Sequence, residues 1–201
     1  MKTQVILVDW ENVQPELLPA LNLAEVKVLV FVGPNQSKLP TDIVTAMQKL
    51  GDKASYITIT KQGKDALDMH IAFYIGQLAN QSANCYFHVV SKDRDYDPLI
   101  AHLKELHIGA ARWPDLESIP LLKRAAAKTP KDRLDAAKEW LLERKANRPK
   151  TIKTLSNSLK TSAFSGQLSD EEIGVLLESL QLLQLIVVQG QKIEYLGILN
   201  A

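Results

Sequence analysis

The sequence contains one cysteine and no long apolar run, and each of these absences excludes a class of protein. Cys85 cannot form a disulfide within the chain, and it begins the apolar run Cys85 to Val90, which indicates a buried thiol rather than a nucleophile. No apolar run approaches the roughly 18 residues that a membrane span needs. The first residues also lack the apolar core and small-residue cleavage site of a secretion signal. We therefore expect a cytoplasmic protein with no membrane partner.

The chain lacks a strong net charge, but its charges are unevenly distributed. The net charge is +1, yet residues 123–160 contain 12 lysines and arginines against 4 acidic residues. The segments on either side, 1–122 and 161–201, are both mildly acidic. A basic segment of this kind is usually a solvated helix face, and it is also what a phosphate backbone attracts. Both interpretations stay open on charge alone.

Apolar runs alternate with helical patterns in the first part of the chain. The expected strands are residues 5–8, 26–32, 54–59, 85–90 and 108–113, and the helical patterns cover about 41–50, 65–80 and 97–107. Strands that alternate with helices of 10–15 residues indicate βαβ units on a parallel sheet. We therefore predict a three-layer α/β domain over residues 1–120.

The pattern changes near residue 130. Helices are expected over 132–145 and 152–159, then from a capping box of Ser169 and Glu172 to about Gln184. Two short apolar runs around Gly190 then predict a β-hairpin. Three helices and a hairpin follow the order of a winged-helix module, although the order is also a generic one. We predict a linker over 121–130 and a small α+β, winged-helix-like domain over 131–201.

Acidic side chains follow two of the expected strands. The buried run Val5 to Val8 stops at Asp9, and Asn12 follows three residues later. Asp93 and Asp95 come after the run 85–90. Ligands of open α/β sheets bind outside the carboxyl ends of strands, so these acids converge if the two strands are neighbours. Alternatively, Asp9 caps a helix that begins near Pro15, or satisfies a turn.

Carboxylates gathered without matching arginines repel one another unless a cation joins them. Asp65 and Asp68 are further acids, and they open the expected helix 65–80. A ligand set made only of oxygen suits Mg²⁺ or Mn²⁺, and such ions typically act on phosphates. The pattern therefore predicts a divalent-ion site that handles phosphate esters.

Three segments resemble a known family. Val8 to Asn12 is similar to the D-x-x-N motif of the NYN branch of the PIN-like nuclease superfamily. Ser91 to Tyr96 resembles its S-x-D-x-D-F/Y motif, and Ala66 to Ala72 resembles the intervening helix with an early aspartate. The resemblance covers about residues 4–115. It implies a Rossmann-like α/β fold, and it implies a protein that cleaves RNA with one or two divalent ions.

The same resemblance implies roles for individual residues. Asp9, Asp68 and Asp93 would be metal ligands, Asp95 would bind the metal or orient the attacking water, and Asn12 and Ser91 would support the site. Many relatives carry a second helix acid about six residues after the first, where this chain has Tyr74. Asp65 either compensates for it or is a helix N-terminal charge favoured by the dipole, and Asp97 is expected to be such a charge.

Cations and one aromatic residue near the acidic loops suggest contacts with RNA. We expect phosphate to be held by Lys61, Lys64, Lys92 and Arg94, and in the basic segment by Lys150 and Lys153. Trp10 would stack a base of a single strand or fill a gap beside the first strand. The four histidines are expected to be packing or surface residues. The acidic helix and hairpin after Asp170 would face a protein partner, and a homodimer is a further option.

The leading hypothesis is therefore a ribonuclease that depends on Mg²⁺ or Mn²⁺ and acts on single-stranded RNA. The alternative is a catalytically weak or inactive PIN-like protein that binds RNA or serves as a scaffold, which the Tyr74 departure favours. A phosphoacceptor of the response-regulator type fits poorly, because the first strand is not followed by a paired acid and a downstream strand-end lysine.

Overall fold

The computed structural model describes residues 2–15, 26–36 and 38–199. The chain forms two compact units, residues 1–119 and residues 120–201, and each is described by itself. The helix expected after Pro15 lies outside the described residues. No helix within the described ranges has the length and apolar character needed to cross a membrane.

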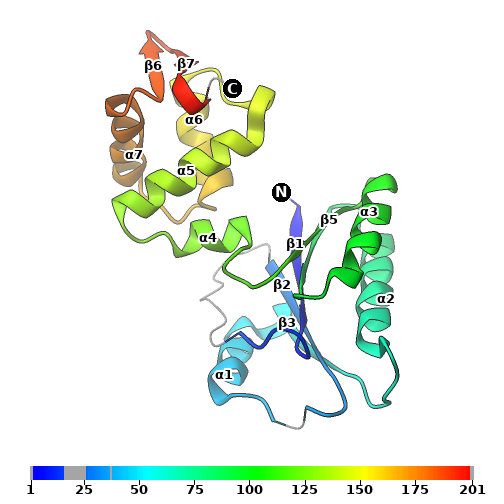
Figure 1. Ribbon diagram of the computed structural model, residues 1–201. Helices are drawn as coiled ribbons and strands as arrows, with labels where there is room; N and C mark the ends of the chain where they lie inside the picture. The colour runs from blue at the N-terminus through cyan, green and yellow to red at the C-terminus, as the bar shows by residue number, and fades with distance from the viewer. Residues whose placement is uncertain (1, 16–25, 37, 200–201) are drawn as a thin grey trace. The chain divides into compact units, whose positions relative to one another are not determined.

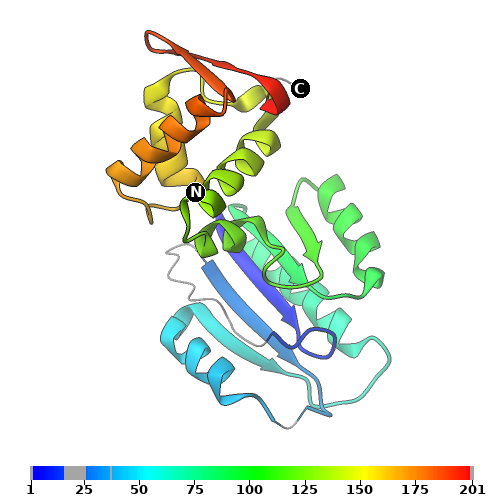
Figure 2. The same ribbon diagram turned by 60° about the vertical axis from the view of Figure 1, so that its left-hand side comes forward.

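The first unit contains a parallel five-stranded sheet with the order β3-β2-β1-β4-β5 (Figures 1 and 2). Its strands are β1 (Thr3–Asp9), β2 (Val26–Val32), β3 (Ala54–Thr58), β4 (Cys85–Val90) and β5 (Gly109–Trp113). β1 is central and pairs with β4 on one side and β2 on the other. The predicted α/β class is confirmed. The strands that precede the two acidic loops are neighbours, as the convergence of Asp9 with the loop after β4 requires.

Helices cover both faces of this sheet. α2 (Ala66–Gln81) and α3 (Asp97–Glu105) lie on one face, and α1 (Thr41–Leu50) lies on the other (Figure 1). On the α2–α3 face, every second strand residue packs against apolar residues of both helices, including Leu7, Phe31, Ile71 and Ile100. β1 is buried on both faces, which explains why its sequence shows no polar alternation. Cys85 is half-buried and packs against this core.

The second unit is built from four helices and a hairpin. They are α4 (Pro120–Ala126), α5 (Pro130–Arg144), α6 (Ile152–Ser158), α7 (Asp170–Leu182), β6 (Ile186–Gln189) and β7 (Lys192–Tyr195). Short helical turns complete the two units: η1 (Gly51–Lys53), η2 (Arg94–Tyr96), η3 (Lys145–Asn147), η4 (Leu159–Ala163) and η5 (Gly197–Leu199). The linker predicted over residues 121–130 is wrong, because α4 occupies most of it and buries Leu122.

Local sequence signals begin the helices of this unit. Thr129, Thr151 and Ser169 each form a capping box at the start of α5, α6 and α7. Each box satisfies backbone N–H groups that the first helical turn leaves without a partner. Thr151 also forms an antiparallel bridge with Lys192, which joins the segment before α6 to the hairpin. Trp140, Leu155 and other apolar side chains form one core beneath these elements.

Candidate active site

The site is centred on Asp9, the last residue of β1. Asp9 follows the alternation of Val5 and Leu7, so its side chain lies on the face that α2 and α3 cover. The residue is 0% exposed. A carboxylate buried to this extent must have all its hydrogen-bonding positions filled, or its charge would be very costly.

Five donors fill these positions. The Oδ1 atom accepts from the backbone N–H groups of Glu11 at 3.1 Å and Asn12 at 3.2 Å. The Oδ2 atom accepts from Asn12 Nδ2 at 2.8 Å, Ser91 Oγ at 3.0 Å and Tyr96 OH at 3.3 Å. Asp9 therefore ties the loop after β1 to the loop after β4. The supporting roles expected of Asn12 and Ser91 match these contacts.

Tyr96 is a site residue that we did not predict. Its ring is 2% exposed, and its hydroxyl also lies within hydrogen-bonding reach of the Asp68 carboxylate. Burial raises the pKa of Tyr96, and the negative charge of Asp9 raises it further, so the hydroxyl stays protonated and can donate. The signal for it was present in the sequence, because Tyr96 ends the motif that begins at Ser91.

Asp68 lies in the first turn of α2 and is half-buried. Burial raises the pKa of its carboxyl group, and the charges of Asp9, Asp93 and Asp65 raise it further, while the hydrogen bond from Tyr96 lowers it. The carboxylates predicted to gather at this edge of the sheet are therefore close enough to repel one another. Such a group of like charges attracts a cation.

Asp93 and Asp95 occupy different positions. Asp93 begins η2, where its Oδ1 accepts from the Asp95 N–H at 2.9 Å, and its own N–H donates to Ser91 Oγ at 3.1 Å. Asp93 is half-buried and lines the same cavity as Asp9 and Asp68. Asp95 is exposed and does not line the cavity, so its contact with the site runs through its backbone.

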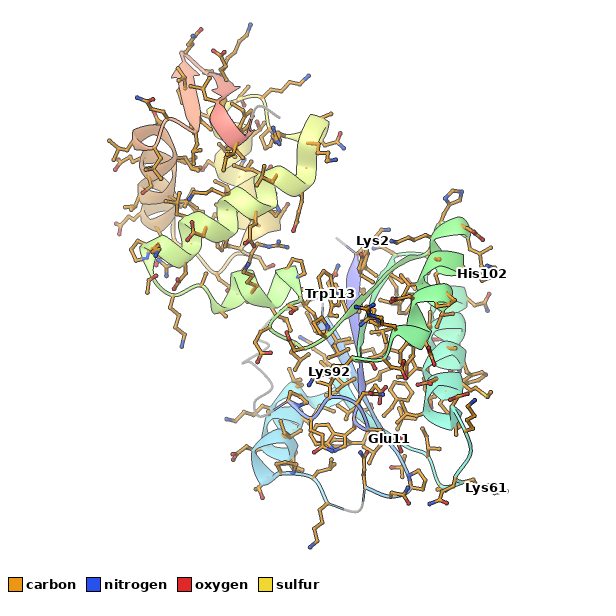
Figure 3. The ribbon with its side chains drawn as sticks, viewed as in Figure 1. Lys2, Glu11, Lys61, Lys92, His102 and Trp113 are labelled. Carbon is orange, nitrogen blue, oxygen red and sulfur yellow. The ribbon has the colours of Figure 1, made fainter. Side chains whose placement is uncertain are left out.

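The cavity has a volume of about 590 Å³. Figure 3 shows Glu11 at the end of β1 and Lys61 on the loop that leads to α2, and both line the cavity. Its polar lining contains the acids Asp9, Glu11, Asp65, Asp68 and Asp93, the cations Lys61 and Lys64, and the amides Asn12, Asn35 and Gln62. Acids outnumber cations in this lining. An anionic group of a substrate would bind at the two lysines.

The other predicted contacts with RNA fall elsewhere. Trp10 is 1% exposed, so the expectation that it stacks a base is wrong; its side chain fills space beside the sheet instead. Lys92 and Arg94 are exposed but do not line the cavity. Lys150 and Lys153 are exposed residues of the second unit.

Neither Asp97 nor the histidines contribute to the cavity lining. Asp97 forms an ion pair with Arg112 at 2.7 Å, as suits a helix-start acid. His88 is buried, where its Nδ1 accepts from Trp113 Nε1 at 3.0 Å and its Nε2 meets Gln4 Oε1 at 2.9 Å. Burial lowers the pKa of His88 to about 4, so this imidazole is neutral near pH 7.

A family model described as a PIN domain matches residues 3–112. The chain belongs to the PIN domain family. No curated protein and no solved structure matches it. PIN domains are generally nucleases and typically use divalent metal ions, so the family supports phosphodiester hydrolysis at this general level. The PIN-like superfamily predicted from the three segments is thus confirmed.

This PIN domain has an aromatic residue where a second helix acid was expected. The Tyr74 ring packs edge-on against Phe31 with 5.4 Å between ring centroids, and it contacts the core on the α2–α3 face. Tyr74 therefore cannot stand in for a carboxylate. The acids that line the cavity come from the strand ends and from the start of α2 instead.

The chemistry of the cavity lining fits a hard divalent ion. Its acidic donors are all carboxylate oxygens, and their charges are not matched by arginines. Over the described ranges, no three carboxylate, imidazole or thiol groups are placed to hold one ion together. Since the oxygens of Asp9 are already engaged, Asp68 and Asp93 are the predicted ligands free to hold an ion. Mg²⁺ is commonly bound through one or two carboxylates together with waters and substrate phosphates.

Proposed function

We propose that the first unit is an NYN-type ribonuclease that hydrolyses RNA phosphodiester bonds with Mg²⁺ or Mn²⁺. The observation that carries the proposal is that Asp9, Asp65, Asp68 and Asp93 line one cavity. Burial raises the pKa of Asp68, and the charges of Asp9, Asp93 and Asp65 raise it further, which indicates repulsion between Asp68 and these acids. A divalent ion relieves this repulsion. When bound, it would polarise a phosphodiester and activate a water.

In this proposal the acids have separate tasks. Asp68 and Asp93 hold the ion, and Asp9 keeps the loop that carries Asp93 in position through Ser91 and Tyr96. Lys61 and Lys64 bind phosphates of the substrate next to the one that is cut. Asp95 holds the Asp93 carboxylate in position through its backbone N–H.

We further propose that the second unit is a winged-helix-like module that binds single-stranded RNA. Three helices and a hairpin, with the Thr151–Lys192 bridge, agree with that arrangement. Lys150 and Lys153 are exposed and form no ion pair with any described residue, so they are free to meet phosphates. Lys160 is paired with Asp170 at 2.6 Å and contributes less.

A protein partner is proposed for α7 rather than RNA. Its first turn contains Asp170, Glu171 and Glu172, which would repel a phosphate backbone. Val175 and Leu182 are exposed apolar residues of the same helix. An acidic helix with exposed apolar side chains suits a basic, partly apolar protein surface.

The alternative function is RNA binding or a scaffold role without cleavage. Two observations favour it. Both oxygens of Asp9 accept hydrogen bonds from groups of its own chain, and Tyr74 stands where many relatives carry a second helix acid. In that case the cavity would bind phosphates without cutting them.

One assay separates the two functions. Labelled single-stranded RNA is incubated with the full chain and Mn²⁺ or Mg²⁺, alongside Asp68→Asn and Asp93→Asn. Metal-dependent cleavage that both variants abolish supports the ribonuclease. Cleavage that persists undiminished in both would exclude this site. Binding without cleavage by the unmodified protein would favour the scaffold. Glu117→Gln is the matched control, because Glu117 is exposed and does not line the cavity.

A further inference from the structure

Glu11 occupies an unusual position next to Gly33. The residue after β2 is Gly33, and a Cβ atom added to it would overlap with Glu11 Oε1 and lie 2.6 Å from Glu11 Cδ. Real Cβ atoms do not come this close to other heavy atoms, so the end of the Glu11 side chain fills the space that a side chain at position 33 would need. The backbone of Gly33 does not adopt the left-handed conformation that favours glycine. A side chain at position 33 would therefore displace the end of Glu11 from the place it occupies.

This contact places the Glu11 carboxylate on the same edge and face of the sheet as Asp9. β2 pairs with β1 so that Phe31 lies beside Asp9, and both residues belong to the face that α2 and α3 cover. Gly33 follows Phe31 by two residues and so continues the same alternation. Glu11 lines the cavity together with Asp68 and Asp93.

The Glu11 carboxylate has no counter-charge of its own. Its backbone N–H donates to Asp9, but its side chain forms no hydrogen bond or ion pair with any described residue. The oxygens of Asp9, by contrast, already accept hydrogen bonds from five donors. Of the two acids in the first loop, Glu11 is thus the one with lone pairs available to a cation.

We propose that Glu11 is a ligand of the divalent ion, directly or through a water, and that Gly33 is the positioning residue that lets its carboxylate reach the cavity. The inference rests on the proposed metal-dependent function of the same site. Glu11 supplies the carboxylate that the helix lacks at Tyr74, and it joins Asp68 and Asp93 around the ion, with water bridging at least one of the three carboxylates to it.

The test measures Mn²⁺ binding to the full chain by calorimetry and by the loss of free-Mn²⁺ electron paramagnetic resonance signal. Because lost partners of a metal site typically cost 10–100-fold in affinity, Glu11→Gln should weaken Mn²⁺ binding at least ~10-fold. Glu117→Gln, the same change at an exposed position outside the cavity, should bind Mn²⁺ as the unmodified chain does.

Gly33→Ala tests the geometry without removing any carboxylate. Only the flexible end of Glu11 must move to admit the methyl group, so the variant is expected to fold, which circular dichroism checks. It should also weaken Mn²⁺ binding. In the Glu11→Gln background it should add little to the weakening already present, since the two changes act through one contact.

The outcomes separate the ligand role from the function. Unchanged Mn²⁺ affinity in Glu11→Gln, with a loss in Asp93→Asn, would overturn the role of Glu11 and leave the nuclease proposal standing. Additive losses from Gly33→Ala and Glu11→Gln would overturn the positioning role of Gly33. An unmodified chain that neither binds Mn²⁺ nor cleaves RNA would overturn both proposals.

Discussion

Tyr96 donates a hydrogen bond to Asp9 across a gap of 3.3 Å, although the two residues lie 87 positions apart in the chain. The contact connects the end of β1 to the turn after β4 and also brings the phenol to Asp68. Asp9 is thereby a fixed anchor of the site, while Asp68 and Asp93 present their carboxylates to the cavity.

Tyr96→Phe removes this hydroxyl and nothing else from the site. The hydrogen bond from Tyr96 lowers the pKa of Asp68, so its loss should raise that pKa further. The acidic limb of the pH–rate profile for RNA cleavage should then shift to higher pH. Stability should fall by about 1 kcal/mol, as expected for one lost hydrogen bond, measured by urea unfolding. An acidic limb that stays in place would mean that Asp68 is not the titrating group.

Asp9→Asn and Asp93→Asn should differ in stability even though both reduce cleavage. The Asp9 carboxylate is fully buried and accepts five hydrogen bonds. In asparagine an NH₂ group replaces one of its oxygens, so this donor would face the donors that now bind the carboxylate. We expect a loss of about 2 kcal/mol or more in the free energy of unfolding. Asp93 caps η2, where asparagine serves equally well, so its variant should stay within ~0.5 kcal/mol. Equal losses in chemical unfolding would contradict the anchoring role of Asp9.

His88 should make the protein less stable in mild acid. Its pKa is about 4 in the folded chain against an ordinary value of 6.5, so the unfolded chain binds the extra proton first as pH falls. The stabilisation is complete above pH 6.5 and decreases toward pH 4, by at most about 3 kcal/mol. Thermal unfolding across this range should show the decrease, and His88→Gln should flatten it.

Asp68 acts on stability in the opposite direction as pH falls. Its pKa is raised in the folded chain, so protonation of Asp68 favours the folded state as pH falls. Asp68→Asn should therefore steepen the loss of stability in acid. A flatter curve in that variant would contradict a raised pKa of Asp68 in the folded chain.

Lysines of the second unit should contribute unequally to RNA binding. Lys150→Gln and Lys153→Gln should each weaken binding of single-stranded RNA and reduce the slope of log affinity against log salt by about 1. Lys160→Gln serves as the matched control, because its ammonium is already paired with Asp170. Filter binding over a range of salt, in the Asp93→Asn background to prevent cleavage, gives these slopes. Equal effects at all three lysines would argue for a diffuse charge effect.

Hydrophobic periodicity sufficed to predict the parallel sheet, since a buried strand and an amphipathic helix impose different repeats on the sequence. It also led to Asp9 and Asp93, because polar residues that directly follow buried strands stand out. The neighbouring positions of β1 and β4 could not be read from the sequence order, as 75 residues separate the end of one strand from the start of the other. For that reason the convergence of Asp9 with Asp93 was predicted only on the condition that the two strands are neighbours.

The incorrect predictions concern side chains whose direction depends on distant contacts. Trp10 follows Asp9 in the chain, and it is buried by other elements of the fold. Hydrophobic periodicity does not predict how those elements pack together. Glu11 was not singled out in the sequence, because it resembles any solvated loop acid until its place beside Gly33 is known. Residues 121–130 looked like a linker because α4 is short, and the burial of Leu122 is visible only in the folded chain.

The position of β1 between β2 and β4 has a consequence for how the cavity forms during folding. Three of its walls come from the loops after β1, β2 and β3, whereas Asp93 arrives only with the loop after β4. A nascent chain that ends before residue 91 would contain Asp9 without Ser91 or Tyr96 to satisfy it. Because such long-range contacts form slowly, the acidic cavity should be among the last features of this unit to assemble. A chain that is only partly synthesised would consequently lack the assembled acidic site.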